Sequence, residues 1–297
     1  MIGLDLGVLL ALLAAFCWVF SGIAIERYTK NHSALIVNFL RIAIALVIMA
    51  VFLAIRGVHP LALDARPQAW LWLSLSGIVG FVLGDYFLFS SYQEVGARIG
   101  LLMISLSTIF VGIISFFLFD EVLSLRSLLG IGLTLIGVLL VVLMRAPEKG
   151  VQWRFSPKGI AYGLLAAIGQ AVGLVLSKLG MGSSDPFTAT QIRLIAATIA
   201  FILVILFTRR VPAVKVALRE RQSLATIIFT AFVGTFLGVT LSLAAVQNTQ
   251  TAVASAILSI MPVLVIPVNW LLFKEKIQAA ELLGTVVTVV GVLVLSF

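Results

Sequence analysis

The chain has 297 residues, of which 62% are hydrophobic and only 11% are charged, and its mean hydropathy is +1.21. This composition excludes an ordinary soluble domain, because a surface that faces water needs many more polar residues. The formal net charge of +8 does not by itself indicate a nucleic-acid partner, and none is expected, since the position of each positive residue along the chain decides its meaning.

Long apolar segments follow one another along the chain. A helix needs about 20 apolar residues to cross the roughly 30 Å of a bilayer core, and segments such as 6–25 and 99–119 contain no charged residue. Helices are expected throughout, because lipid-exposed backbone must satisfy its own hydrogen bonds. We therefore predict an all-α polytopic membrane protein with ten transmembrane helices at about 6–25, 34–55, 69–93, 98–118, 125–144, 159–178, 187–208, 223–246, 251–273 and 279–296.

The positive residues predict an orientation in the membrane. Lys and Arg concentrate in the loops that follow odd-numbered spans, whereas the loops that follow even-numbered spans contain only Arg56, Arg66, Arg126 and Lys178. The positive-inside rule then places the odd-numbered loops in the cytoplasm and both termini on the non-cytoplasmic side of the inner (plasma) membrane. A basic group in the seventh loop is interpreted as a topology determinant, with RNA or anionic lipid as alternative partners.

The two halves of the sequence resemble each other. Each half has five spans, an odd number, so the second half enters the membrane from the opposite side. Inverted repeats are typical of secondary transporters, which bind substrate near the midplane between the repeats. We predict a first repeat at 1–146, a connecting loop at 147–157 and a second repeat at 158–297. Arg41 recurs as Arg193, Val79-Gly80 and Leu83-Gly84 recur as Val233-Gly234 and Leu237-Gly238, and Leu128-Leu129-Gly130 recurs as Leu282-Leu283-Gly284.

These motifs resemble the EamA family of the drug/metabolite transporter superfamily. The family has an Arg early in its second and seventh helices, which matches Asn38-Phe39-Leu40-Arg41 and Pro186 through Arg193. It also has a Pro-containing helix that ends in an apolar run and Glu before a Leu-Leu-Gly helix, which matches Pro262 through Glu275 followed by 282–284. The resemblance covers nearly the whole chain. It implies a ten-helix carrier that exports amino acids or related metabolites.

Three ionisable residues are predicted to lie well inside spans, where charge is costly and usually pairs or faces a polar cavity. Arg41 and Asp85 should both lie roughly 10–12 Å deep from the cytoplasmic side, so we predict an ion pair between them. Either substrate or protons break this pair, or it is a structural link. Arg193 has Val239 where the counter-charge of its repeat partner would be. It either attracts a substrate carboxylate or extends towards the outer interface.

Neutral polar residues at a similar depth indicate a polar cavity between the spans. Trp and Tyr give a cavity wall an apolar face with a polar edge. The alternative for each polar residue is a single interhelical hydrogen bond, worth only about 0.6 kcal/mol on average. The predicted cavity residues are Trp18, Asn38, Arg41, Asp85, Tyr86, Gln170, Gln191, Arg193 and Thr240.

Small residues predict close packing in the fifth and tenth spans. Gly130 and Gly137 lie two turns apart on one helix face, as do Gly284 and Gly291, so these faces are expected to form scaffold or dimer contacts. The chain is accordingly expected to be a monomer or a homodimer.

Two further features concern the helix ends and bends. Pro262 and Pro267 interrupt the hydrogen-bond ladder of the ninth span, which makes that span a candidate bending element. Thr108 stands where Pro262 stands in the other repeat, so the two halves are not expected to bend alike. Glu121 and Glu275 are interpreted as caps of the fifth and tenth helices at the cytoplasmic side, with a role in gating as the alternative.

No enzyme motif stands beside these features. The two histidines, His32 and His59, both lie in loops, and neither a His-Glu-x-x-His motif nor a Gly-rich phosphate loop with Lys occurs. We expect no metal, no cofactor and no enzymatic activity. The predicted function is secondary transport of a small-molecule substrate by alternating access. The alternatives are a multidrug carrier, a nucleotide-sugar carrier, a channel and a structural membrane protein.

Overall fold

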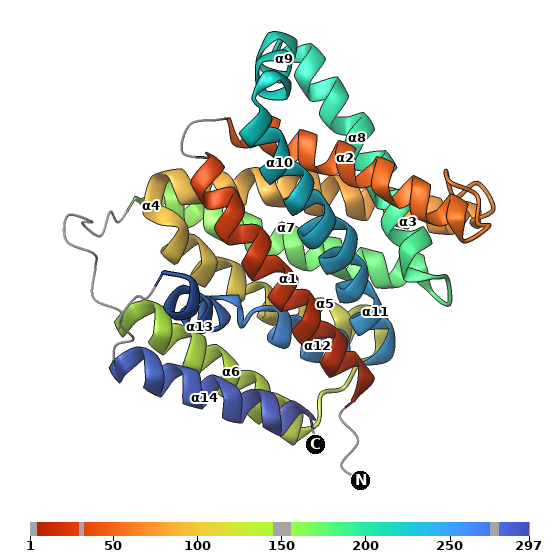
Figure 1. Cartoon of the computed structure of the whole chain (residues 1–297). Coiled ribbons are helices and arrows are strands. Elements are labelled where there is room, and N and C mark those ends of the chain that lie inside the picture. The colour runs from red at the N-terminus through yellow and green to blue at the C-terminus, as the bar shows by residue number, and fades with distance from the viewer. Residues whose placement is uncertain (1–4, 30–32, 145–155, 274–278, 297) are drawn as a thin grey trace.

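The computed structural model describes residues 5–29, 33–144, 156–273 and 279–296, and all regular structure in these ranges is helical (Figure 1). The first half contains α1 (Leu6–Thr29), α2 (Ala34–Ile55), α3 (Pro67–Gly77), η1 (Ile78–Gly84), α4 (Asp85–Ser105), α5 (Ser107–Phe119) and α6 (Leu125–Met144). The second half contains α7 (Pro157–Met181), α8 (Pro186–Phe207), α9 (Val211–Arg219), α10 (Arg221–Thr230), η2 (Ala231–Val239), α11 (Thr240–Asn248), α12 (Thr251–Leu258), α13 (Met261–Phe273) and α14 (Ala279–Ser296).

Local sequence signals set the start of several helices. Proline opens α3, α7 and α8, at the position where a missing N–H sacrifices no helical hydrogen bond. Ser156 caps α7, because its hydroxyl accepts a hydrogen bond of 3.2 Å from the N–H of Gly159. The same helix ends at Gly182, whose positive φ of 51° is costly for any residue with a side chain.

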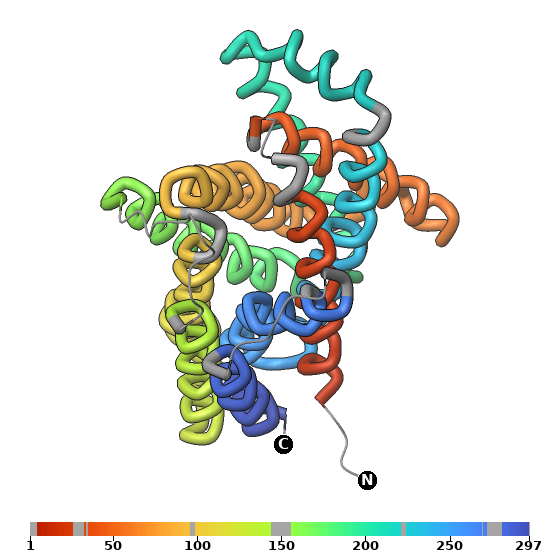
Figure 2. The backbone as a smooth tube through the Cα atoms, turned by 60° about the vertical axis from the view of Figure 1, so that its left-hand side comes forward, coloured from red at the N-terminus to blue at the C-terminus, as the bar shows by residue number. Residues whose placement is uncertain are grey.

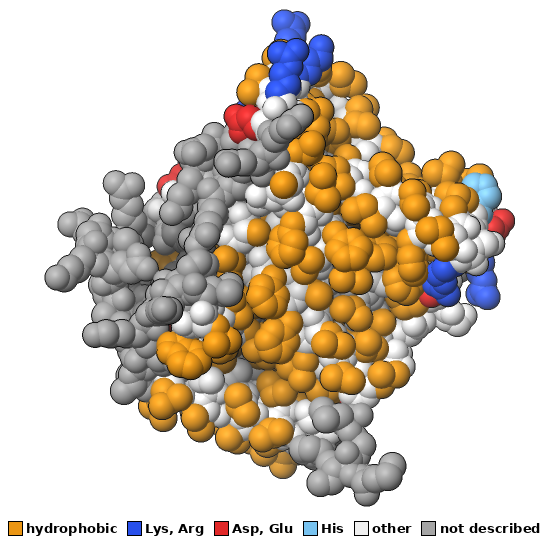
Figure 3. Space-filling model, viewed as in Figure 1, with side chains coloured by type: hydrophobic (Ala, Val, Ile, Leu, Met, Phe, Trp, Pro, Cys, Tyr) orange, Lys and Arg blue, Asp and Glu red, His pale blue; other side chains and the backbone are white. Residues whose placement is uncertain are grey.

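The helices have the length and the surface of membrane spans. Within the described residues, nine helices are apolar enough to cross a bilayer, and the shorter apolar helix at 281–296 supplies the tenth predicted span. The molecular surface is apolar over a broad face, whereas Lys and Arg gather at the tip formed by α9 (Figure 3). These findings confirm the all-α, ten-helix membrane fold, since large exposed side chains such as Phe117 and Ile55 require lipid as their solvent.

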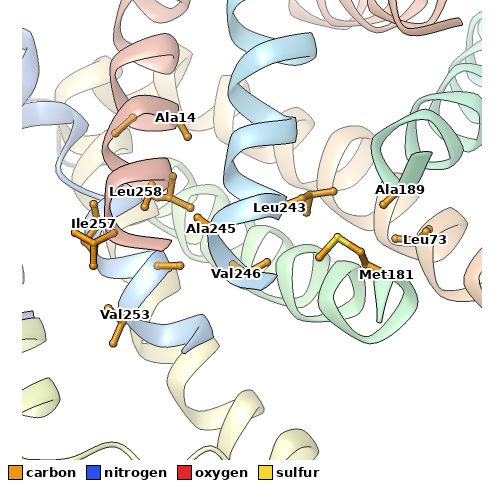
Figure 4. Packing of buried hydrophobic residues seen from close by; sticks show 14 of the residues in the cluster. Ala14, Leu73, Met181, Ala189, Leu243, Ala245, Val246, Val253, Ile257 and Leu258 are labelled. Atoms are coloured by element: carbon orange, nitrogen blue, oxygen red, sulfur yellow. The ribbon is translucent and has the colours of Figure 1, made fainter. Parts of the chain in front are cut away.

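The buried core lies between the two halves. Its main cluster joins side chains from α1 and α3 with side chains from α7, α8, α11 and α12 (Figure 4). Ala and Val are frequent in this cluster, which lets the helix backbones approach closely where water cannot drive association. The fold therefore positions side chains of both repeats around one shared interior.

The fifth and tenth spans form a separate antiparallel pair. Helices α6 and α14 lie side by side in both views (Figures 1 and 2). A Cβ added to Gly137 would lie 2.7 Å from the backbone oxygen of Gly284, and one added to Gly291 would lie 2.9 Å from that of Gly130. The four predicted glycines thus face each other within the chain, where the lack of side chains permits backbone contact.

Matching π-helical segments interrupt the third and eighth spans. The segment η1 contains Gly80 and Gly84, and η2 contains their repeat partners Gly234 and Gly238. Such wide turns shift backbone carbonyls out of the ordinary α-helical pattern and are frequent at functional sites. Both segments lie beside the polar side chains described below.

The fourth and ninth spans also break at matching positions. Helix α4 gives way to α5 at Leu106, and α12 gives way to α13 at Ser259 and Ile260. The two halves were not expected to bend alike, because Thr108 stands where Pro262 stands in the other repeat, yet both spans are interrupted at matching positions. The first of these breaks occurs without a proline. Beside it, the Ser105 hydroxyl donates to the backbone oxygens of Leu101 at 3.0 Å and Ser259 at 3.5 Å, and such side-chain bonds to the backbone compete with the helical pattern. The two breaks thus meet between the repeats.

Candidate functional site

An ion pair with side-chain hydrogen bonds lies inside the bundle. A terminal nitrogen of Arg41 on α2 lies 2.8 Å from Oδ2 of Asp85 on α4, and these side chains are only 14% and 11% exposed. The predicted ion pair is therefore confirmed. Asn38, one turn earlier on α2, accepts a 2.7 Å hydrogen bond from Arg41 and donates to the Phe81 carbonyl at 2.9 Å. These contacts fix the arginine against the third span.

The second repeat completes this network. The amide of Gln170 on α7 donates to Oδ1 of Asp85 at 2.9 Å and to the carbonyl of Gly80 at 3.3 Å. Its repeat partner Trp18 on α1 donates to the carbonyl of Gly234 at 3.0 Å. Each repeat thus reaches across to the matching π-helical carbonyl of the other. In the first repeat this contact also includes a buried carboxylate.

Arg193 lies on the other side of the same segment. Its guanidinium lies 4.5 Å from the centre of the Phe81 ring, and the residue is 5% exposed. Its Nε is buried without a hydrogen-bond partner among the described residues. A Cβ added to Gly80 would lie 3.3 Å from a terminal nitrogen of Arg193. Gly80 therefore separates Arg193 from the Gln170 amide.

The remaining predicted cavity residues are more scattered. Tyr86 is 50% exposed, although it follows the buried Asp85 directly. Gln191 donates to the carbonyl of Pro60 at 2.7 Å and so binds the second loop. The hydroxyl of Thr240 lies 2.6 Å from the Phe236 carbonyl and 3.3 Å from the Thr190 hydroxyl. The structure thus brings together five of the predicted residues around η1, namely Asn38, Arg41, Asp85, Gln170 and Arg193. Trp18 on α1 makes the matching contact with η2.

A second polar cluster, which the sequence did not reveal, joins the two repeats at one end of the molecule. Lys178 lies 2.6 Å from Glu121, whose carboxylate also accepts hydrogen bonds of 2.9 Å from the N–H and the hydroxyl of Thr251. Glu121 therefore caps α12 of the other repeat, and its interpretation as a cap of the fifth helix is wrong. Glu275 lies outside the described residues. We call Glu121, Lys178 and Thr251 the end cluster.

The end cluster lies at the even-numbered loops. Glu121 belongs to the loop between the fourth and fifth spans. Neighbouring side-chain amides add hydrogen bonds at the same end. Gln247 donates to the carbonyls of Gly182 and Ser184, each at 3.1 Å, and Gln250 donates to that of Val122 at 3.1 Å. The available sequence signal was Lys178, one of the few positive residues near the even-numbered loops.

Known proteins share this architecture. The chain is 32% identical over 170 residues to an uncharacterized transporter of Archaeoglobus fulgidus, an alignment that spans 57% of this chain and 58% of the relative. It is 26% identical to an uncharacterized transporter of Synechocystis over 77% of this chain and 72% of the relative. A crystal structure of 17% identity superposes with a TM-score of 0.76, covering 98% of this chain and 96% of the other, and supports the fold alone.

The family assignment covers both repeats. The profile of the EamA-like transporter family matches residues 5–143 and again residues 157–297. These two matches correspond to the two five-span halves, with their polar side chains around matching π-helical segments. The chain is therefore a multi-pass membrane protein that belongs to the EamA-like transporter family.

Proposed function

We propose that this protein is a secondary transporter that exports amino acids or related small metabolites by alternating access across the inner membrane. The observation that carries the proposal is the bridge at Asp85, whose carboxylate binds Arg41 of its own repeat and Gln170 of the other. A buried polar link between inverted repeats is the kind of contact that a moving carrier makes and breaks around its substrate. Transport needs no covalent chemistry at such a site.

The end cluster supports the alternating-access part of the proposal. It links the loop before α6, the end of α7 and the start of α12, which belong to both repeats. The distribution of Lys and Arg favours the non-cytoplasmic side for this end. We infer that Glu121 and Lys178 hold the outer gate closed and that the gate opens when this ion pair separates.

Counterflow in proteoliposomes tests the proposed function. Vesicles loaded with an unlabelled solute should take up the same labelled solute, and uptake should saturate because each transport cycle occupies one site. A panel of amino acids, nucleosides and cationic drugs separates the proposed substrate class from a multidrug carrier. Flux without saturation or countertransport would instead indicate a channel, and absence of flux from folded protein across the panel would contradict the proposal.

A further inference from the structure

We propose that Arg193 is the binding subsite for a carboxylate group of the transported solute. This inference rests on the proposed function and names the chemistry that its site recognises. The guanidinium is buried against the Phe81 ring, its Nε has no hydrogen-bond partner, and no ion pair to it is found among the described residues. Removing an arginine from water is costly, and contact with one aromatic ring replaces only part of its hydration.

The nearest acid in the network is already engaged. Asp85 uses Oδ2 to accept from Arg41 and Oδ1 to accept from Gln170, so its carboxylate has partners on both oxygens. The residues around η1 thus include two buried arginines, Arg41 and Arg193, but only one buried carboxylate, that of Asp85. One further anionic group would balance this charge, which favours a solute that carries a carboxylate over one without an anionic group.

The surroundings of Arg193 favour a carboxylate in particular. Guanidinium presents a planar fork of N–H donors that matches the two oxygens of a carboxylate. Gly80 lies next to one terminal nitrogen of Arg193, and a Cβ there would meet only Arg193 and the Cα of Gly173 within 4 Å. Because position 80 has no side chain, that nitrogen has no side-chain contact from this position. The repeat partner of Gly80 differs, because a Cβ at Gly234 would collide with Ser21.

The test compares amino acids with their amides, which keep the size of the solute but lose its negative charge. Competition in counterflow and protection against thermal unfolding in detergent are both measured for the wild type, Arg193→Gln and Arg193→Lys. Arg126→Gln is the control, because Arg126 is an exposed arginine whose Nε donates to the Val294 carbonyl far from η1. Gly80→Ala crowds the guanidinium without removing its charge, and Gly22→Ala, with nothing within 4 Å of the added Cβ, is its control.

The wild type should prefer the acid to the amide. Arg193→Gln should weaken binding of the acid about 10- to 100-fold, the range for a hydrogen bond to a charged group, while binding of the amide stays nearly constant. Arg193→Lys should recover part of the preference, and Gly80→Ala should reduce it.

The possible results separate this inference from the proposed function. Counterflow without any preference for the acid over the amide would overturn the proposed subsite while supporting the proposed transport function. Counterflow with a preference that is unchanged in folded Arg193→Gln would have the same meaning. Protection by acids that depends on Arg193, without counterflow, supports the subsite and overturns the transporter. Neither protection nor counterflow with any acid of the panel overturns both.

Discussion

Asp85 joins three helices through one carboxylate, which makes it the residue whose removal should be felt most strongly. Asp85→Asn keeps the shape but leaves Arg41 buried without its counter-charge. We expect a loss of about 3 kcal/mol in the free energy of unfolding, as is typical when one partner of a buried pair is removed. Denaturation in mixed detergent measures it, with Arg56→Gln as control, because the exposed Arg56–Asp185 pair should contribute less than about 1 kcal/mol.

A double-mutant cycle shows whether the two charges act together. Arg41→Gln combined with Asp85→Asn removes both charges, so the double variant should be at least about 1 kcal/mol more stable than the sum of the two single changes predicts. Additive losses would mean that the 2.8 Å contact between Arg41 and Asp85 contributes no coupling energy.

At this scale the sequence predicts part of the network. Counting residues from the helix ends was enough to predict that Arg41 and Asp85 lie at the same depth in the membrane, since the rise per residue fixes how far each lies from the end of its helix. The sequence could not predict the bridge by Gln170, because that contact depends on how α7 of the other repeat packs across η1. For the same reason nothing in the sequence distinguished Gln170, which reaches the carboxylate, from Gln191, which binds the Pro60 carbonyl.

Among the elements, the α6–α14 pair depends on backbone contact. Gly137→Ala would place a Cβ 2.5 Å from the Thr288 backbone nitrogen and 2.7 Å from the Gly284 oxygen. We expect a loss of about 1–3 kcal/mol through forced separation of the helices. Gly132→Ala on the same helix, with nothing within 4 Å, should be neutral or stabilising because alanine favours helix. Equal thermal stability of the two variants would show that the close approach is unimportant.

The end cluster gives a second prediction at the level of elements. Glu121→Gln weakens both the 2.6 Å ion pair with Lys178 and the cap of α12. In a Cys17→Ser background with Thr249→Cys, a membrane-impermeant maleimide should label the cysteine roughly tenfold faster when Glu121 is Gln, because charged hydrogen bonds of this kind hold the end closed.

The matched control for this measurement lies at the opposite end of the molecule. Glu94→Gln breaks the 3.3 Å contact with Lys158 and should leave the labelling rate at Thr249→Cys unchanged. If Glu121→Gln and Glu94→Gln gave the same rate, the end cluster would not be a gate.

Prediction of elements from the sequence succeeded for the spans and failed at their interruptions. Apolar length is a property of each segment by itself, so the ten spans follow directly. The break at Leu106 has no proline to signal it and depends on contacts such as the one between Ser105 and Ser259, which form only between the folded repeats. The π-helical segments likewise had no distinguishing local signal beyond their paired glycines.

For the whole molecule, the inverted repeat could be recognised because Arg41 and Arg193, and the glycine pairs around them, kept a steady register along the chain. The repeat symmetry also explains why Trp18 and Gln170 make equivalent contacts. The functional proposal depends on a difference between the repeats. Val239 occupies the position in the second repeat that Asp85 occupies in the first, so Arg193 lacks the acidic residue that pairs with Arg41.

Orientation is a prediction for the whole chain. The concentration of Lys and Arg in odd-numbered loops predicts that Thr249→Cys reacts with an impermeant maleimide from outside intact cells, whereas a cysteine in place of Lys215 on α9 reacts only after the membrane is opened. Labelling of the α9 position from outside would reverse the proposed topology and place the end cluster at the cytoplasmic side.

Counterflow of labelled amino acids in proteoliposomes tests whether this protein is an amino acid carrier. We expect saturable uptake driven by unlabelled amino acid in the wild type, and a large loss of uptake in folded Asp85→Asn, because the bridge between the repeats is part of the transport cycle. Folded wild-type protein without counterflow for any solute of the panel would contradict the claim, and so would full activity in folded Asp85→Asn.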